Sequence, residues 1–158
     1  MTRGFEWLTD EKVKLGLLAF LFVWIGIVTV TNIINGLDIL GLAGGDIPFS
    51  SGNYEMMRDK ASHLNPPEFL LGALFVGVII WEFVIFLLFG NAIRNYCHRN
   101  VTQAYGVSFG LFAGFIIIDD IIGAFGIENS HRNILIMLIA TYLYIYLTSK
   151  KYSQIPEG

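Results

Sequence analysis

Three carboxylates lie inside runs of apolar residues, where acidic side chains are rare. Asp119 and Asp120 are adjacent in the apolar stretch 106–127, and Glu82 lies in the middle of a second such stretch. A carboxylate in hydrocarbon costs at least about 2.5–3.5 kcal/mol. Other groups of the protein must therefore receive these acids, and the identity of those groups decides which chemistry is available.

Three kinds of role are open to these acids. In the first, they are neutral or hydrogen-bonded to amides and hydroxyls, and only fix the register of the helices. In the second, they form a proton or cation site, with Asn32 and His131 as further polar members. In the third, Glu82, either Asp119 or Asp120, and His131 bind a metal ion, with Glu82, Asp120 and His131 as the candidate ligands, although the Glu-x-x-His spacing of two-metal carboxylate bundles is absent. Whether the protein holds a cofactor is unknown from the sequence.

Nucleophilic catalysis is poorly supported, so the sequence favours a protein that is not an enzyme. Cys97 and His98 are sequence neighbours at a helix end rather than an oriented pair, and Ser108 has no base near it in the sequence. The single cysteine also excludes an internal disulfide and a cysteine-rich zinc site.

The helices must bring the polar residues together. Glu82 is near the centre of its stretch and the aspartates lie about four residues past the centre of theirs, so antiparallel neighbours would place all three acids at similar depth. More polar groups are expected toward the same side of the membrane, at the end of the first apolar stretch and before the last one: Asn32, Asn35, Asp38, Glu128, Ser130 and His131.

A helix-packing stripe is formed by Gly106, Gly110 and Gly114, which recur every four residues and let another helix approach closely. The stripe serves either packing within the chain or contact with another subunit. Around the helix, Asp120 lies about 80° from Gly110. We therefore expect Asp120 to face the packed interior and Asp119 to face the flank.

The composition indicates a membrane protein. Of 158 residues, 54% are hydrophobic and only 15% are charged, whereas a soluble domain has about 25% charged residues. The net charge is −3 and the basic residues are scattered, which gives no indication of a nucleic-acid partner. The length suits one helical bundle, so residues 1–158 are expected to form a single integral membrane domain in the lipid bilayer.

Four apolar segments predict an all-α fold, a four-helix transmembrane bundle with helices at about 13–36, 69–92, 104–127 and 133–149. The first three have the roughly 20 residues that cross a bilayer, and the fourth is shorter. The first is expected to remain as a helix rather than to be a cleaved signal. Asn65, Asn100 and Ser130 are predicted to cap the later helices, and residues 52–61 to form a short amphipathic helix in the long loop 37–65.

The basic residues near the helix ends predict the orientation, since cytoplasmic loops carry the excess of lysine and arginine. The side that carries both termini holds seven of them: Arg3, Lys12, Lys14, Arg94, Arg99, Lys150 and Lys151. The other side holds three: Arg58, Lys60 and Arg132. Both termini are thus expected to be cytoplasmic and the loop 37–65 extracytoplasmic.

Several short motifs occur together along the chain. They are an asparagine-rich helix end followed by an acid, a loop stretch 53–58 of the form Asn-x-x-Met-x-Arg, the pair Trp81-Glu82, and acidic residues at the end of the stretch from Phe115 to Asp120. In these features the chain resembles the bacterial "predicted small integral membrane proteins" of unknown function. It departs from them at Asp119 and Asp120, where the family has Gly-Gly-Glu-Trp-Phe. The resemblance implies a four-helix membrane topology and no particular activity.

The function expected from the sequence is that of a non-catalytic accessory or structural subunit, whose partners are other membrane subunits or further copies of the chain. The glycine stripe and the lack of a catalytic constellation favour it. The alternative is a proton- or cation-coupled transporter or channel that uses Glu82, Asp119 and Asp120, and the second alternative is a carboxylate–histidine metal or redox site. The expected location is the inner membrane of a prokaryote.

Overall fold

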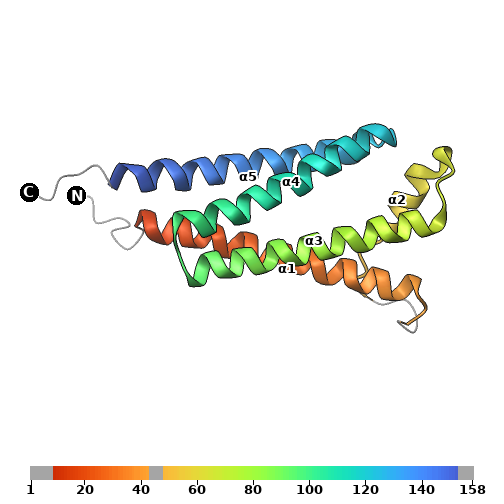
Figure 1. Ribbon diagram of the computed structural model, residues 1–158, viewed down its shortest axis with the longest axis horizontal. Helices are drawn as coiled ribbons and strands as arrows, with labels where there is room; N and C mark the ends of the chain where they lie inside the picture. Colours follow the sequence, from red (N-terminus) through yellow and green to blue (C-terminus); the bar gives the residue numbers. More distant parts are fainter. Residues whose placement is uncertain (1–8, 43–47, 153–158) are drawn as a thin grey trace, which may run out of the picture.

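The computed structural model describes residues 9–42 and 48–152, and these ranges contain no strand. The elements are α1 (Asp10–Ile39), α2 (Asn53–Ala61), the 3₁₀ turn η1 (Ser62–Leu64), α3 (Glu68–Arg94), α4 (His98–Ile121) and α5 (Phe125–Tyr152) (Figure 1). The four helices α1, α3, α4 and α5 are long and apolar enough to cross a membrane. The predicted all-α class and the four predicted spans are confirmed, and the predicted loop helix is confirmed as α2.

The starts of α1 and α3 follow from local sequence. The Oγ1 of Thr9 accepts a hydrogen bond at 3.4 Å from a first-turn backbone N–H of α1. Asp10 and Glu11 fill that turn, where the helix dipole favours negative charge. Pro67 precedes α3 in an extended conformation. The predicted cap Asn65 lies earlier, in the left-handed region at φ 49°, so that cap prediction is wrong.

The boundary between the last two long helices differs from the prediction. Helix α4 ends at Ile121 instead of 127, and α5 begins at Phe125 instead of 133. The chain turns at Gly123, whose φ is +67°. The predicted caps Asn100 and Ser130 lie inside helices, and Cys97 is the residue before α4. The last helix is consequently 28 residues long, or about 42 Å at 1.5 Å per residue, which is enough to cross a bilayer.

The turn at Gly123 allows a direct test by substitution. A Cβ added there meets no atom within 4 Å, so only the left-handed backbone opposes a side chain. Gly123→Ala is expected to lower the free energy of unfolding by about 1 kcal/mol. Gly126→Ala is the matched control, because Gly126 is also open but lies within α5, where alanine stabilises by up to about 1 kcal/mol. Thermal unfolding in detergent measures both, and a loss of stability in both variants would contradict the assignment of the turn.

The helices pack as two antiparallel pairs, α1 with α3 and α4 with α5, joined mainly through α3 and α4. The pairs lie close together at the end where α1 begins and α5 ends, which we call the terminal end (Figure 1). They diverge toward the opposite end, where α2 lies, which we call the α2 end (Figure 1). The divergence leaves room between the pairs at the α2 end.

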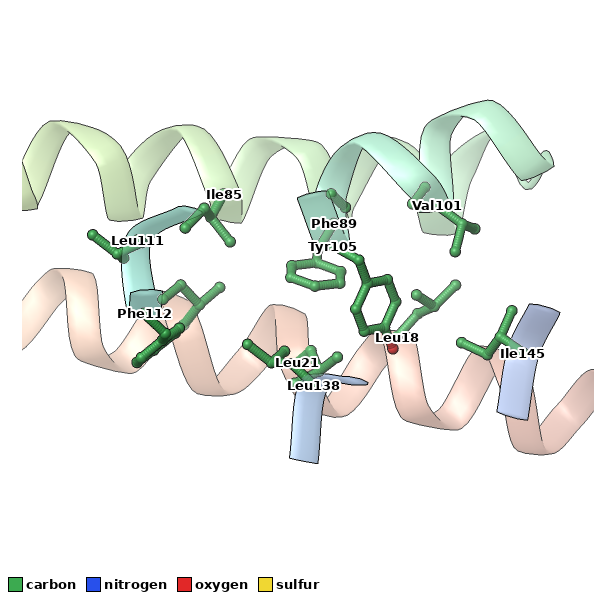
Figure 2. Packing of buried hydrophobic residues seen from close by; sticks show 13 residues of the cluster. Leu18, Leu21, Ile85, Phe89, Val101, Tyr105, Leu111, Phe112, Leu138 and Ile145 are labelled. Carbon is green, nitrogen blue, oxygen red and sulfur yellow. The ribbon is translucent and has the colours of Figure 1, made fainter. Parts of the chain in front are cut away.

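The main hydrophobic core fills the half of the bundle toward the terminal end. It consists of buried residues from all four long helices: Leu18, Leu21, Ile25, Ile85, Phe89, Ala92, Val101, Ala104, Tyr105, Leu111, Phe112, Leu138 and Ile145. Figure 2 shows Phe89 and Tyr105 near the middle of this cluster. A smaller cluster, Tyr54, Ala61, Leu71 and Phe75, joins α2 to α3. The two halves of the bundle therefore differ: the main core lies in the terminal half, and α2 packs on α3 in the other.

Candidate functional site

A cavity of about 260 Å³ lies at the α2 end, between the diverging helix pairs. Its walls are mostly apolar, with residues of all five helices among them. The polar side chains that line it are Asn32, Asn53, Glu82, Asp119 and His131. Four of the five residues proposed for the ion or proton site thus surround one cavity, and the fifth, Asp120, does not line it.

Glu82 forms the deep end of the cavity and is only 3% exposed. Both of its carboxylate oxygens accept a hydrogen bond from Nδ2 of Asn32, at 2.9 Å each. The Oδ1 of Asn32 in turn accepts from Nδ2 of Asn53 at 2.7 Å. No lysine, arginine or histidine of the described ranges forms an ion pair with Glu82. The carboxylate therefore keeps acceptor capacity that the protein does not fill.

The chain that leads into α2 turns back along α1 toward the middle of the bundle. The backbone N–H of Ser51 donates to the carbonyl oxygen of Thr31 at 3.3 Å, eight residues before the end of α1 at Ile39, or about 12 Å. Asn35 holds the start of α2, accepting from the backbone N–H of Tyr54 at 2.9 Å. Irregular backbone within a membrane is tolerated where it is buried or lines a cavity. Residues 48–52 run back along α1 in this way, and we call them the re-entrant segment.

Sequence reasoning missed the contribution of α2 to the cavity. Asn53, Met56 and Met57 line it from that helix, and Trp24 and Phe112 line it from α1 and α4. The available signal was the methionine pair on a short amphipathic helix, since methionine side chains adapt to irregular apolar surfaces. What a single sequence does not show is how far the segment re-enters.

Tyr54 anchors α2 to α3. Its hydroxyl donates to Oε1 of Glu68 at 2.6 Å, and this hydrogen bond is the main cause that raises the pKa of Tyr54 above its ordinary value of 10.0. The neutral phenol is the form that donates, so the stabilisation is complete below about pH 10 and is lost as the pH rises through the raised pKa.

Tyr54→Phe is expected to lower the free energy of unfolding by about 1 kcal/mol at neutral pH. As the pH rises above about 10, the wild type loses the hydrogen bond as well. The difference in the free energy of unfolding between wild type and variant should therefore narrow. Denaturant unfolding in detergent between pH 7 and 11 measures this. Tyr146→Phe, at a tyrosine of α5 that is 38% exposed, is the control, and a difference that persists unchanged to pH 11 would contradict the role of the hydroxyl.

Asp119 is the aspartate that faces the interior. It is buried at 6% exposure and its Oδ2 lies 2.6 Å from Nδ1 of His131. The histidine ring stacks on Phe115, with ring centroids 4.6 Å apart. Asp120 is exposed, so the expectation that Asp120 faces the interior and Asp119 the flank is wrong.

The glycine stripe explains the inversion. A Cβ added at Gly106 or Gly114 meets no atom within 4 Å, and one at Gly110 meets only Trp81, at 3.2 Å. The stripe thus faces away from the packed interior. Asp119 follows Gly110 by nine residues, or about 180° around a helix, which places it on the opposite, buried face.

The expected equal depth of the three acids is also wrong. The Nε1 of Trp81 donates to the carbonyl oxygen of Val107 at 3.2 Å, so Glu82 lies at the level of the residues around 107–110 of α4. Asp119 is nine residues beyond Gly110, about 14 Å further along the helix. The cavity joins the two acids along this distance, with Glu82 deep and the Asp119–His131 pair toward the α2 end.

The proposed metal trio is not assembled. Within the described residues, no group of three or more histidine, cysteine, aspartate or glutamate side chains is placed to hold a metal ion. Asp120 is exposed, whereas Glu82 and His131 line the cavity. Cys97 is exposed at the start of α4, and it is not among the residues that line the cavity.

Fold and site together define an all-helical protein with four helices able to cross a bilayer and an acidic cavity between them. No protein-family model, curated protein or solved structure matches the chain. The function must therefore be argued from the cavity itself.

Proposed function

We propose that the protein is a small membrane carrier that takes up a cation or a proton at Glu82. The observation that carries the proposal is a cavity that ends on a buried carboxylate with no basic partner among the described residues. A carboxylate in low dielectric is stabilised by a cation or by a proton, and the two compete for it. Exchange of one for the other at Glu82 would couple their movements.

The packing of the bundle favours a carrier over an open channel. The cavity is confined to the α2 end, while the main core fills the terminal half from Leu18 to Ile145 without a described opening to the cavity. In the orientation that the basic residues support, the α2 end faces outward, both termini are cytoplasmic, and the cavity is open to the outside. Transport would then require the terminal half to open, most simply by rocking of one helix pair against the other. A prokaryotic inner membrane suits this orientation.

Flux across liposome membranes tests the proposal. The full chain is reconstituted, an outward proton gradient or a monovalent cation gradient is imposed, and internal pH is followed with a dye. The wild type should move protons against the counter-cation, and Glu82→Gln should return the flux to the level of protein-free liposomes. Asp120→Asn is the matched control, since it removes an exposed acid outside the cavity. Equal flux in wild type and Glu82→Gln would reject the proposal.

A second candidate, a subunit of a larger membrane complex, is favoured by the outward-facing glycine stripe. Gly106 and Gly114 offer a face of α4 against which no other described residue packs within 4 Å of their Cβ positions. Replacing both by leucine should not lower the stability of the isolated protein, because both sites are open and helical, and should prevent association with the partner. Native gel migration of membranes extracted in mild detergent measures this, and migration as a single chain in wild type and variant alike would reject it.

A further inference from the structure

We infer that the cavity binds a monovalent organic ammonium ion that carries one apolar group of about the size of an aromatic ring. The inference rests on the proposed function and deepens it, by naming the class of cation that Glu82 receives. It follows from the charge, the walls, the size and the openings of the cavity.

The charge distribution places the ammonium group at Glu82. This carboxylate is buried and receives hydrogen bonds from a single amide, that of Asn32. The other acid that lines the cavity, Asp119, is already paired with His131. The positive charge of a monovalent ligand is therefore expected to lie beside the carboxylate of Glu82, at the deep end of the cavity.

The surroundings of Glu82 suit an organic cation better than an inorganic one. A small metal cation gives up its water only for several oxygen ligands arranged around it, and the described residues place no group of three or more histidine, cysteine, aspartate or glutamate side chains together. An alkylated ammonium is weakly hydrated and is attracted to aromatic faces within about 6 Å. Trp24 and Phe112, stacked with centroids 6.0 Å apart, and Phe75 and Phe115 supply such faces in the walls.

The size limits the apolar part. The cavity measures about 260 Å³, just below the range of about 300–1,000 Å³ that is typical of sites for drug-sized ligands. One ring with a short ammonium arm fits this space. Met56 and Met57 of α2 lie at the wall, and their flexible side chains can close around ligands of slightly different shape.

The openings match an amphiphilic ligand. Leu74 of α3 and Ile118 of α4 line the cavity and are 44% and 39% exposed. Both belong to helices able to cross the membrane, so this side of the cavity opens toward lipid. Met56, 38% exposed on α2, marks a second opening. An ammonium with an apolar group partitions into the membrane interface and reaches either opening.

Binding of benzyltrimethylammonium to the full chain in lipid nanodiscs tests the inference. This probe carries a permanent charge, so a change of pH acts only on the protein. The titratable groups that line the cavity are Glu82, Asp119 and His131. Calorimetry, together with tryptophan fluorescence, to which Trp24 in the cavity wall contributes, should report the affinities. Benzyltrimethylammonium should bind at least tenfold more tightly than tetramethylammonium, which lacks the ring, and than benzyl alcohol, which lacks the charge.

Three variants complete the test. Glu82→Gln should weaken binding of benzyltrimethylammonium at least tenfold and leave that of benzyl alcohol unchanged, which also shows that the cavity is still formed. Trp24→Leu should weaken the binding of benzyltrimethylammonium more than that of tetramethylammonium. Asp120→Asn should leave the affinity for both cations unchanged. Unchanged affinity in Glu82→Gln, or equal affinity for the two cations, would overturn the inference.

The two proposals fail in different ways. Proton or inorganic cation flux that depends on Glu82, with no binding of benzyltrimethylammonium, overturns the ligand class and leaves the carrier function standing. Binding that depends on Glu82, with no flux of benzyltrimethylammonium or protons in liposomes, overturns the carrier function and supports the ligand class.

Discussion

Asn32→Leu is expected to lower the free energy of unfolding by about 3 kcal/mol, because it leaves the buried carboxylate of Glu82 without a hydrogen-bond donor. Both oxygens of that carboxylate accept hydrogen bonds from the amide of Asn32, and Glu82 is only 3% exposed. The substitution also removes Oδ1 of Asn32, which accepts a hydrogen bond from Nδ2 of Asn53. Denaturant unfolding in mixed micelles measures the loss.

The double variant Asn32→Leu/Glu82→Met separates this effect from simple repacking. When both partners are replaced by apolar groups of similar shape, the unsatisfied carboxylate disappears and most of the lost stability should return. Asn91→Leu is the matched control, since Asn91 is an exposed asparagine of α3. A double variant that is less stable than Asn32→Leu alone would show that the pair does not act as a unit.

The sequence predicted the spans well, because length and apolarity decide whether a helix can cross a bilayer. The predicted 69–92 segment differs from α3 by only a few residues at each end. The loop helix was also predictable, because the polar and apolar residues of 52–61 alternate with a helical period. The turn at Gly123 was missed because it interrupts an apolar stretch without any charged residue between Asp120 and Glu128.

The candidate site was predictable in its members and not in its geometry. Glu82, Asn32 and His131 stood out because polar groups in apolar segments need partners. The choice between Asp119 and Asp120 depended on which way the glycine stripe faces, and the spacing of glycines does not distinguish an inward from an outward face. The re-entrant segment depends on contacts such as Asn32 with Asn53, 21 residues apart, and no local pattern indicates them.

Phe89→Ala is expected to lower the free energy of unfolding by about 3–4 kcal/mol, because it leaves a cavity in the core of the terminal half. Phe89 is 1% exposed and its ring meets that of Tyr105 edge to face, with centroids 5.4 Å apart (Figure 2). Both rings lie where the four long helices meet, so no neighbouring side chain fills the space without moving a helix. In a carrier this core is the barrier that separates the cavity from the other side of the membrane. The variant is therefore also expected to let protons leak in liposomes without a counter-cation.

Phe69→Ala is the matched control for both effects, since Phe69 belongs to the same helix but is 78% exposed. It should change the unfolding free energy by less than about 1 kcal/mol and cause no leak. Thermal unfolding in detergent and dye-reported proton flux in liposomes are measured for both variants. Because α1, α3, α4 and α5 all contribute to the core around Phe89, a leak in Phe89→Ala alone would locate the closed barrier in the terminal half. Only the ring of Phe89 is packed between the helices, whereas that of Phe69 is exposed. Equal proton leaks in the two variants would therefore show that the barrier lies outside the core around Phe89.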